Sequence, residues 1–362
     1  MEQRGMKSSA TPVEICILGA GPVGCALALL LHSAGRKVCL VDRKSQPGKL
    51  PLRPIALSHA SRLILERICV WDVLRATPIQ AIHISQQGAF GRVRLGASDA
   101  GVPALGYVVD YQSLVDRLHA RLETPGIRIA GEAQEAPLVI HAEGTSSELR
   151  EKNYAQEALV ALVACSPAAD ATAWERFTPE GPLALLPLGG RYCAVWGMRP
   201  ERAQALCAAT EAEFLEALAG AFGRRAGEFL GVGERSRVPL ALRVRPSRVG
   251  ARQAYVGNAA QMLHPVAGQG LNLGLRDAWD LAQVLHGAQD PGDARVLERF
   301  AAMRRLDAAA SIRVTDFLAG AFLGANPLAG LMRGFGLTAL DICLPARRFF
   351  ARRMIYGNSA LP

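Results

Sequence analysis

The chain has 362 residues, 50% of them hydrophobic, and a formal net charge of +9. This length allows two or three domains of ordinary size with large apolar cores. No apolar run reaches the roughly 18 residues that span a bilayer, and residues 1–12 lack the apolar core of a signal peptide. These features predict a cytoplasmic protein.

The basic excess does not indicate a nucleic-acid-binding protein, because only 6% of the residues are aromatic and no known binding motif occurs. Part of the excess lies close to the C-terminus, at Arg347, Arg348, Arg352 and Arg353. That cluster favours an anionic partner surface. The eight cysteines include no C-x-x-C pair, so we expect reduced core residues, without disulfides or a metal site.

The first motif is a strand that leads into a glycine-rich turn. The β-branched run 13–18 ends at GAGPVG, which contains Gly19, Gly21 and Gly24, and residues 26–34 have helical character. Glycines at these positions allow a tight turn and the close approach of a pyrophosphate.

A second predicted strand supports this interpretation. Pro22 suits the first turn of a helix, and residues 37–41 form a strand that ends at Asp42. An acidic residue roughly 20 residues beyond the glycines is expected to hold the ribose hydroxyls of a dinucleotide. The order predicts a dinucleotide-binding site; the alternative is a structural β-turn-α unit.

The middle of the chain alternates between helical and strand patterns. After a polar loop that contains Arg53, residues 55–74 are predicted to form a helix that starts at Ser58 or Ser61. A strand at 106–109 and a helix at 112–122 predict a further β-α step toward the sheet. Further strands are predicted at 79–95, 137–141, 159–165, 183–188, 191–196, 237–244 and 253–256, and one helix at 201–222.

A second glycine-rich segment begins another helix. Gly268, Gly270 and Gly274 surround Asn272, and apolar residues recur at helical spacing behind them. We expect this segment to present backbone N–H groups to a planar or anionic ligand and not to pack a core. A glycine-rich loop before an ordinary helix is the alternative.

The pattern predicts an α/β fold with a Rossmann-type dinucleotide-binding domain, an interleaved domain built on a mixed β-sheet, and C-terminal helices. The predicted nucleotide-binding parts are 13–80, 106–156 and 250–290, the interleaved domain has the parts 81–105 and 157–249, and the helices occupy 291–362. An apolar stretch at 317–344 precedes the arginine cluster. It fits an interfacial membrane helix, or a helical hairpin packed on the protein itself.

Taken together, the motifs resemble the ubiquinone-biosynthesis branch of the flavin-dependent aromatic hydroxylases, relatives of para-hydroxybenzoate hydroxylase. The resemblance covers nearly the whole chain and rests on five segments: 19–24, 53–61, 174–188, 257–277 and 304–307. It implies that the Rossmann-type domain is an FAD-binding domain and that the interleaved mixed β-sheet domain is the substrate domain. It also implies tight binding of FAD, hydride uptake from NADH or NADPH, and insertion of an oxygen atom from O2 into a prenylated phenol. Other ubiquinone-biosynthesis proteins and the inner membrane face are further partners that it suggests.

The resemblance also implies roles for individual residues. Arg53 would lie near the flavin and pyrophosphate, or form a surface salt bridge, and Glu143 near the flavin and nicotinamide entry, or be a plain turn carboxylate. His264 would act on the phenol proton or serve as a structural hydrogen bonder. The remaining expected cofactor contacts are Asn258, Pro265, Gly268, Gln269, Gly270, Leu271 and Asn272.

Three departures from the family pattern leave other functions open. Glu143 stands where relatives have Asp, Gln261 stands where a histidine is common, and the stretch 121–143 is short. A non-catalytic FAD-binding or assembly subunit of the same pathway is therefore one alternative. A flavin hydroxylase of another aromatic compound is the second. Arg276 and Asp277 are predicted to be an intrahelical or interdomain ion pair with a structural role.

Overall fold

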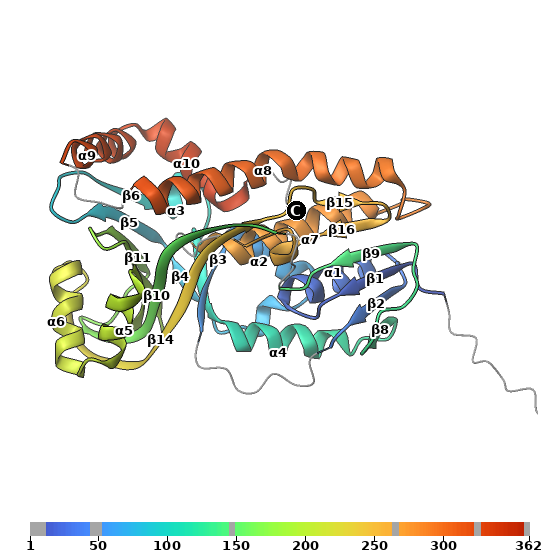
Figure 1. The fold of residues 1–362 in the computed structure, drawn as a ribbon, viewed down its shortest axis with the longest axis horizontal. Helices are drawn as coiled ribbons and strands as arrows, with labels where there is room; N and C mark the ends of the chain where they lie inside the picture. The colour runs from blue at the N-terminus through green and yellow to red at the C-terminus, as the bar shows by residue number, and fades with distance from the viewer. Residues whose placement is uncertain (1–11, 44–52, 145–148, 263–267, 322–326, 358–362) are drawn as a thin grey trace, which may run out of the picture.

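The computed structural model describes residues 12–43, 53–144, 149–262, 268–321 and 327–357, with side chains omitted for 311–329. The molecule is elongated, with one sheet near each end and helices between them (Figure 1). This arrangement is the mixed α/β fold that the sequence predicts. Among the described residues, no helix combines the length and apolarity that crossing a membrane requires.

The first sheet has six strands and is mostly parallel. Its strands, in spatial order, are β15 (Val249–Gly250), β16 (Gln253–Tyr255), β9 (Leu138–His141), β1 (Ile15–Leu18), β2 (Val38–Val41) and β8 (Ile127–Ala130). The buried β-branched and aliphatic residues of β1 and β2 explain why these segments form central strands.

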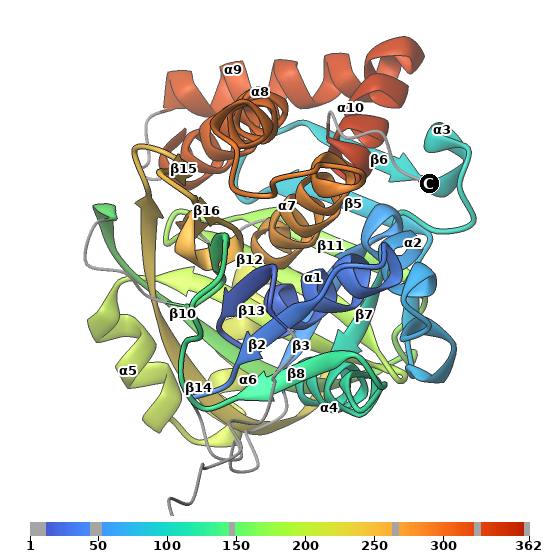
Figure 2. The same cartoon turned by 90° about the vertical axis from the view of Figure 1, so that its right-hand side faces the viewer.

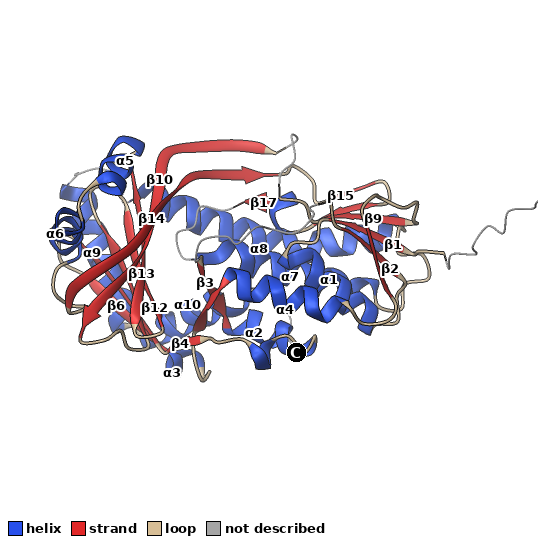
Figure 3. Cartoon of the chain, turned by 90° about the horizontal axis from the view of Figure 1, so that it is seen from below, coloured by secondary structure: helices blue, strands red, loops and turns tan. Residues whose placement is uncertain are grey.

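One face of this sheet is covered by helices that lie on the side of the second sheet (Figure 3). They are α1 (Pro22–Ser33), α4 (Tyr111–Leu122) and α7 (Gln269–Leu285). Their apolar residues join those of the strands in one large core. Helix α7 is buried almost all round, because α8 (Ala294–Ala321) covers its far side.

The second sheet has eight strands, and its pairs are antiparallel except β11 with β5. In spatial order they are β17 (Gln261–Met262), β14 (Glu228–Val244), β10 (Arg150–Ser166), β13 (Arg191–Met198), β12 (Pro182–Leu188), β11 (Thr172–Phe177), β5 (Ala81–Gln86) and β6 (Arg92–Gly96). The long strands β10 and β14 reach from this sheet toward the first (Figure 1).

Different elements pack on the two faces of the second sheet. One face carries α5 (Pro200–Ala208) and α6 (Glu211–Phe222). The other contacts a small third sheet of β3 (Pro54–Ser58), β7 (Gly106–Asp110) and β4 (Thr77–Ile79). It also contacts α9 (Pro327–Ile342), and with α8 and α10 (Leu344–Tyr356) this helix forms a layer along one side of the molecule (Figure 2).

Several predicted elements need correction. The helix predicted at 55–74 is divided into β3, α2 (His59–Arg67) and the short helix η1 (Trp71–Val73), because β3 pairs with β7. Ser58 is the N-cap of α2, as one of the two predicted starts, and its hydroxyl accepts from the Ser61 N–H.

Two further corrections concern the middle of the chain. Strand β7 pairs antiparallel with β3 and β4, so the predicted β-α step does not extend the parallel sheet. The helix predicted at 201–222 is two helices, because Thr210 and Glu213 form a capping box that starts α6. The sequence also missed β11 as a separate strand, and a short helix α3 (Ala97–Ala100).

Candidate functional site

The first glycine loop lies at the carboxyl end of β1, where backbone segments approach too closely for side chains. A Cβ at Gly19 would lie 2.9 Å from the carbonyl of Ala142, and Gly19 has φ +106. A Cβ at Gly24 would lie 2.0 Å from the Gly19 oxygen. Both positions therefore require glycine for packing as well as for conformation.

Gly21 differs from these two glycines because no heavy atom lies within 4 Å of the position of an added Cβ. Gly21 is the N-cap of α1, no side chain caps this end, and Pro22 occupies the first helical turn. The first N–H groups of a helix have no partner within the helix and attract anions. This open helix end can hold a pyrophosphate.

The peptide that follows Gly19 is fixed by two donors that sequence reasoning did not single out. The Ala20 carbonyl oxygen accepts from Cys25 Sγ at 3.1 Å and contacts His119 Nε2 at 3.0 Å. Burial and then the Asp42 charge raise the pKa of the Cys25 thiol to about 12, which keeps it a neutral donor. His119 comes from α4, about 100 residues away, so no local pattern indicates this contact.

Asp42 and Glu143 lie at the same edge of the sheet as the loop. β1 pairs with both β2 and β9, so the ends of these strands lie side by side. The Gly19 N–H donates to Val41, and the Gly19 Cβ position is 3.0 Å from the Glu143 nitrogen. The Glu143 carboxylate is 3.2 Å from Arg43, a contact that sequence reasoning missed.

The second glycine segment contacts the first. Gly268 is the N-cap of α7 in the left-handed conformation, with φ +59, and an added Cβ at Gly270 would meet nothing within 4 Å. A Cβ at Gly274 would lie 2.7 Å from the Val23 side chain. The expectation that this segment does not pack a core is therefore wrong for Gly274, which lets α7 approach α1 closely.

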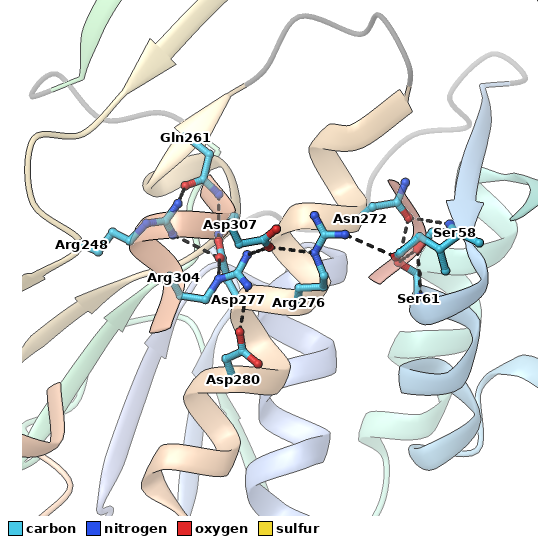
Figure 4. A network of polar contacts seen from close by, with 12 residues as sticks. Ser58, Ser61, Arg248, Gln261, Asn272, Arg276, Asp277, Asp280, Arg304 and Asp307 are labelled. Atoms are coloured by element: carbon cyan, nitrogen blue, oxygen red, sulfur yellow. Dashed lines mark hydrogen bonds and ion pairs between the residues drawn. The ribbon is translucent and has the colours of Figure 1, made fainter. Parts of the chain in front are cut away.

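Asn272 uses its whole side chain to hold α7 in place (Figure 4). Its oxygen accepts from the Ser58 N–H at 2.8 Å and the Ser61 hydroxyl at 2.7 Å. Its amide donates to the carbonyls of Ala56 at 3.0 Å and Gly268 at 2.7 Å. An amide side chain offers two acceptor sites and two donors, so none is left for a ligand.

The other predicted site residues are placed as follows. Arg53 is exposed, and its guanidinium lies over the Tyr111 ring, 5.2 Å from the ring centroid. It directly precedes β3, and Ala56 of that strand is 3.3 Å from the position of a Cβ at Gly268. Asn258 is exposed after β16. Gln269 and Leu271 are half-buried in the first turn of α7. His264 and Pro265 lie outside the described residues.

A buried network of charges lies behind this glycine segment (Figure 4). Asp277 Oδ1 is 3.1 Å from Arg248 and 2.7 Å from Arg304, whereas Arg276 pairs with Asp307 at 3.1 Å. Arg276 and Asp277 therefore each pair with residues outside α7 and not with one another. Arg304 also contacts Asp280 and Asp307, each at 2.8 Å, which joins α7 to α8.

Burial lowers the pKa of Arg304, but the carboxylates of Asp277, Asp307 and Asp280 outweigh burial and raise it above its ordinary value. For the acid Asp277, burial acts in the other direction and raises the pKa, but the charges of Arg248 and Arg304 hold it below its ordinary value. Arg304 and Asp277 therefore remain charged near neutral pH. The network is structural, and it fixes the helix that carries Gly270 and Leu271.

Comparisons with known proteins identify the family. The FAD binding domain model matches residues 12–153 and 132–315. The chain is 31% identical to the ubiquinone hydroxylase UbiL of Rhodospirillum rubrum, over 94% of this chain and 88% of that protein. It is also 31% identical to the 3-demethoxyubiquinol 3-hydroxylase of Escherichia coli K12, over 91% of this chain and 95% of that protein.

Solved structures share the fold at low sequence identity. The p-nitrophenol 4-monooxygenase PnpA of Pseudomonas putida DLL-E4 superposes with a TM-score of 0.74 at 17% identity, over 94% of this chain and 96% of that chain. HpxO of Klebsiella pneumoniae, in complex with FAD and uric acid, has a TM-score of 0.70 at 14% identity, over 94% and 96% of the two chains.

The residues of this chain fit the cofactor of that family. Gly21 and Gly270 leave open space beside the uncapped start of α1 and the first turn of α7, as a bound FAD requires. The chain therefore belongs to the FAD-binding domain family, as an FAD-dependent monooxygenase of the aromatic hydroxylase type that is related to ubiquinone-pathway hydroxylases.

Proposed function

We propose that this protein hydroxylates the aromatic ring of a prenylated phenol in ubiquinone biosynthesis, with NADH or NADPH and O2 as co-substrates. The observation that carries the proposal is the convergence of two glycine-started helices, α1 and α7. Helix α7 begins beside β3, and β3 packs with its small sheet on the apolar face of the second sheet. The similarity to two proteins named for ubiquinone hydroxylation supports the choice of substrate.

The chain offers distinct groups for each part of the cofactor. The first turn of α1 would bind the pyrophosphate, and Asp42 would bind ribose hydroxyls. The N–H groups of Gly270 and Leu271, in the first turn of α7, would face the pyrimidine edge of the flavin, where negative charge develops on reduction. When bound, FAD supplies the hydride acceptor and the activation of O2 that no side chain can provide.

Asn272 has a narrower role in this proposal than the sequence predicts. Its side chain is saturated by Ser58, Ser61, Ala56 and Gly268. It would therefore position β3 and α7 against each other and not contact the flavin. Its own N–H is at the fourth helical position, where a helix supplies the partner, so it is not a flavin contact either.

The C-terminal helices support contact with a membrane surface that delivers a lipid-tailed substrate. Apolar side chains on α8, α9 and α10 are exposed, among them Leu306 (65%), Met332 (66%), Phe335 (63%), Ile342 (77%) and Phe349 (72%). Arginines such as Arg348 and Arg352 lie on the same helices. Exposed apolar residues next to cations are what an anionic lipid surface or another ubiquinone-biosynthesis protein would bind.

The test is the quinone lipid profile, by mass spectrometry, of a strain that lacks this gene and carries Gly270→Leu on a plasmid. A Cβ added at Gly270 meets no atom of the described residues within 4 Å, so the variant should fold but exclude the flavin. We expect ubiquinone to fall and one under-hydroxylated intermediate to accumulate, as in the deletion strain. The mass of that intermediate identifies the missing hydroxylation.

The matched control is Gly220→Leu, in α6, where an added Cβ also meets no atom of the described residues within 4 Å. Its strain should have normal ubiquinone, because α6 lies on the far face of the second sheet. If the Gly270→Leu protein restores ubiquinone, the protein acts as a scaffold. If deletion changes no quinone, its substrate is another aromatic compound.

A further inference from the structure

Strand β11 places one carboxylate on the face of the second sheet that looks toward the flavin-binding domain. Trp174 donates to the Tyr192 hydroxyl at 3.1 Å, and Arg176 donates to the Ala221 carbonyl of α6 at 3.0 Å. Successive side chains of a strand point to opposite faces. Glu175, between these two residues, therefore points away from α6.

The neighbours of Glu175 on that face are apolar. Directly opposite it are Ile84 of β5 and Ala184 of β12. Its Oε1 atom is buried without a hydrogen-bond partner, and the described residues provide no ion pair for the carboxylate. A buried polar atom normally has a partner, and among the described residues this oxygen has none, so it is free to accept a hydrogen bond from a ligand.

This face continues directly to the start of α7. Ala173, two residues before Glu175 and on the same face, belongs to an apolar cluster that includes Ala56 of β3. Ala56 is the residue that lies 3.3 Å from the Cβ position of Gly268. Residues two apart on a strand are separated by about 7 Å, so Glu175 lies one step farther along the face that packs on this cluster.

Burial raises the pKa of Glu175 from 4.5 to about 7, and no charged neighbour contributes to the shift. Arg176 points to the other face. Arg333 of α9 lies on the same face but donates to Gln86, at 3.3 Å. The other residues of the cluster, from β3, β4, β7 and β12, are apolar. A carboxyl group in this state is suited to exchange a proton at neutral pH.

We propose that Glu175 binds the ring hydroxyl of the aromatic substrate and accepts its proton. The inference rests on the proposed function for the identity of the substrate, but not for the presence of a phenol-binding carboxylate. The phenol O–H bond breaks, the proton forms an O–H bond on the Glu175 carboxylate, and the electron pair stays on the phenol oxygen. The ring becomes richer in electrons where oxygen is inserted, and the proton returns to solvent or product afterwards.

The first experiment measures binding without turnover. The FAD-loaded protein is titrated with 2-geranylphenol and with its methyl ether at pH 7.5, and the change in flavin absorbance gives each Kd. We expect wild type to prefer the phenol by about tenfold, because a single hydrogen bond to a charged group has that effect. Glu175→Gln should reduce the preference to about twofold or less, and Glu175→Asp should retain part of it.

The matched control is Glu157→Gln, which changes a carboxylate of the same sheet that pairs with Arg237 at 3.1 Å on the α5 and α6 side. This variant should keep the wild-type preference. A Glu175→Gln protein that loads FAD normally and still prefers the phenol as strongly as wild type would overturn the proposal.

The second experiment follows turnover of 2-geranylphenol between pH 5.5 and 9. Wild type should show an ionisation near pH 7 in kcat/KM, and Glu175→Gln should lose it together with about 100-fold in kcat/KM. If wild type distinguishes the phenol from its ether but hydroxylates no prenylated phenol, the assigned pathway fails and the role of Glu175 stands. If hydroxylation proceeds with an unchanged pH profile in Glu175→Gln, the role of Glu175 fails and the proposed function stands.

Discussion

Two carboxylates, that of the buried Asp277 in α7 and that of the half-buried Glu175 in β11, have opposite environments. Asp277 accepts from Arg248, Arg304, Gly257 and Gln261, at distances between 2.7 and 3.1 Å. Glu175 has no partner among the described residues. The pKa of Asp277 is accordingly lowered and that of Glu175 is raised to about 7. Partners, and not burial itself, decide whether a buried acid stabilises the fold or remains available for chemistry.

Removal of Arg304, the cation that three carboxylates share, should have the largest effect on stability. Arg304→Met leaves Asp277, Asp280 and Asp307 buried without the guanidinium that joins them. We expect the free energy of unfolding to fall by about 3–5 kcal/mol, as for other broken buried ion pairs. Urea unfolding of the FAD-free proteins measures the change.

The neighbouring Arg305→Met is the control for this substitution, because Arg305 is exposed on the same helix. It should change the free energy of unfolding by less than about 0.5 kcal/mol. Equal losses in the two variants would mean that the network adds nothing beyond the packing of the arginine side chains.

A substitution at Glu175 should raise the free energy of unfolding relative to wild type, in contrast to Arg304→Met, and the size of this effect should depend on pH. The folded protein binds this proton more tightly than the unfolded chain, because the pKa rises from 4.5 to about 7. The stability that this group contributes is present below pH 4.5 and is lost as the pH rises to 7. At about 1.4 kcal/mol for each pKa unit, the loss is on the order of 3.5 kcal/mol.

Glu175→Gln does not titrate, so its free energy of unfolding should rise relative to that of wild type between pH 5 and pH 7 and then remain level. Urea unfolding at pH 5, 6, 7 and 8 measures this difference. Glu157→Gln, which alters a partly exposed ion pair, should show no such rise. A constant difference between wild type and Glu175→Gln across this range would contradict an unpaired buried carboxylate.

The contrast also explains what could be predicted from the sequence. The glycine loop 19–24 and the end of β2 were found because their geometry depends on consecutive residues. The partners of Asp277 lie 29 residues before it and 27 after it, in the case of Arg248 and Arg304. No local pattern joins such positions. The sequence therefore suggested a pair between adjacent Arg276 and Asp277, which the fold does not form.

Contacts between distant segments also determine the environments of residues 55–58 and Asn272. The helical spacing of Leu63, Ile64 and Ile68 predicts a helix over 55–74. Its start at Ser58 is confirmed, but pairing with β7 makes the preceding residues a strand. Asn272 is well placed in sequence for a ligand, but β3 and the start of α2 use its side chain completely. Glu175 could not be singled out, because its isolation depends on Ile84 and Ala184 from other strands.

Gln261 should give the smallest effect in this comparison, because it is the one neutral side chain among the described residues that donates to Asp277. Its amide donates to Asp277 Oδ2 at 2.8 Å, and its oxygen accepts from Arg248. Gln261→Leu should cost about 1–2 kcal/mol of unfolding free energy, because a buried charge loses one donor and keeps its two arginines. Gln261→His, the residue common in the resembling family, should lose less, since an imidazole N–H can donate to the same oxygen. Urea unfolding at pH 7.5 ranks the three proteins, and a leucine variant as stable as wild type would mean that the arginines alone satisfy Asp277.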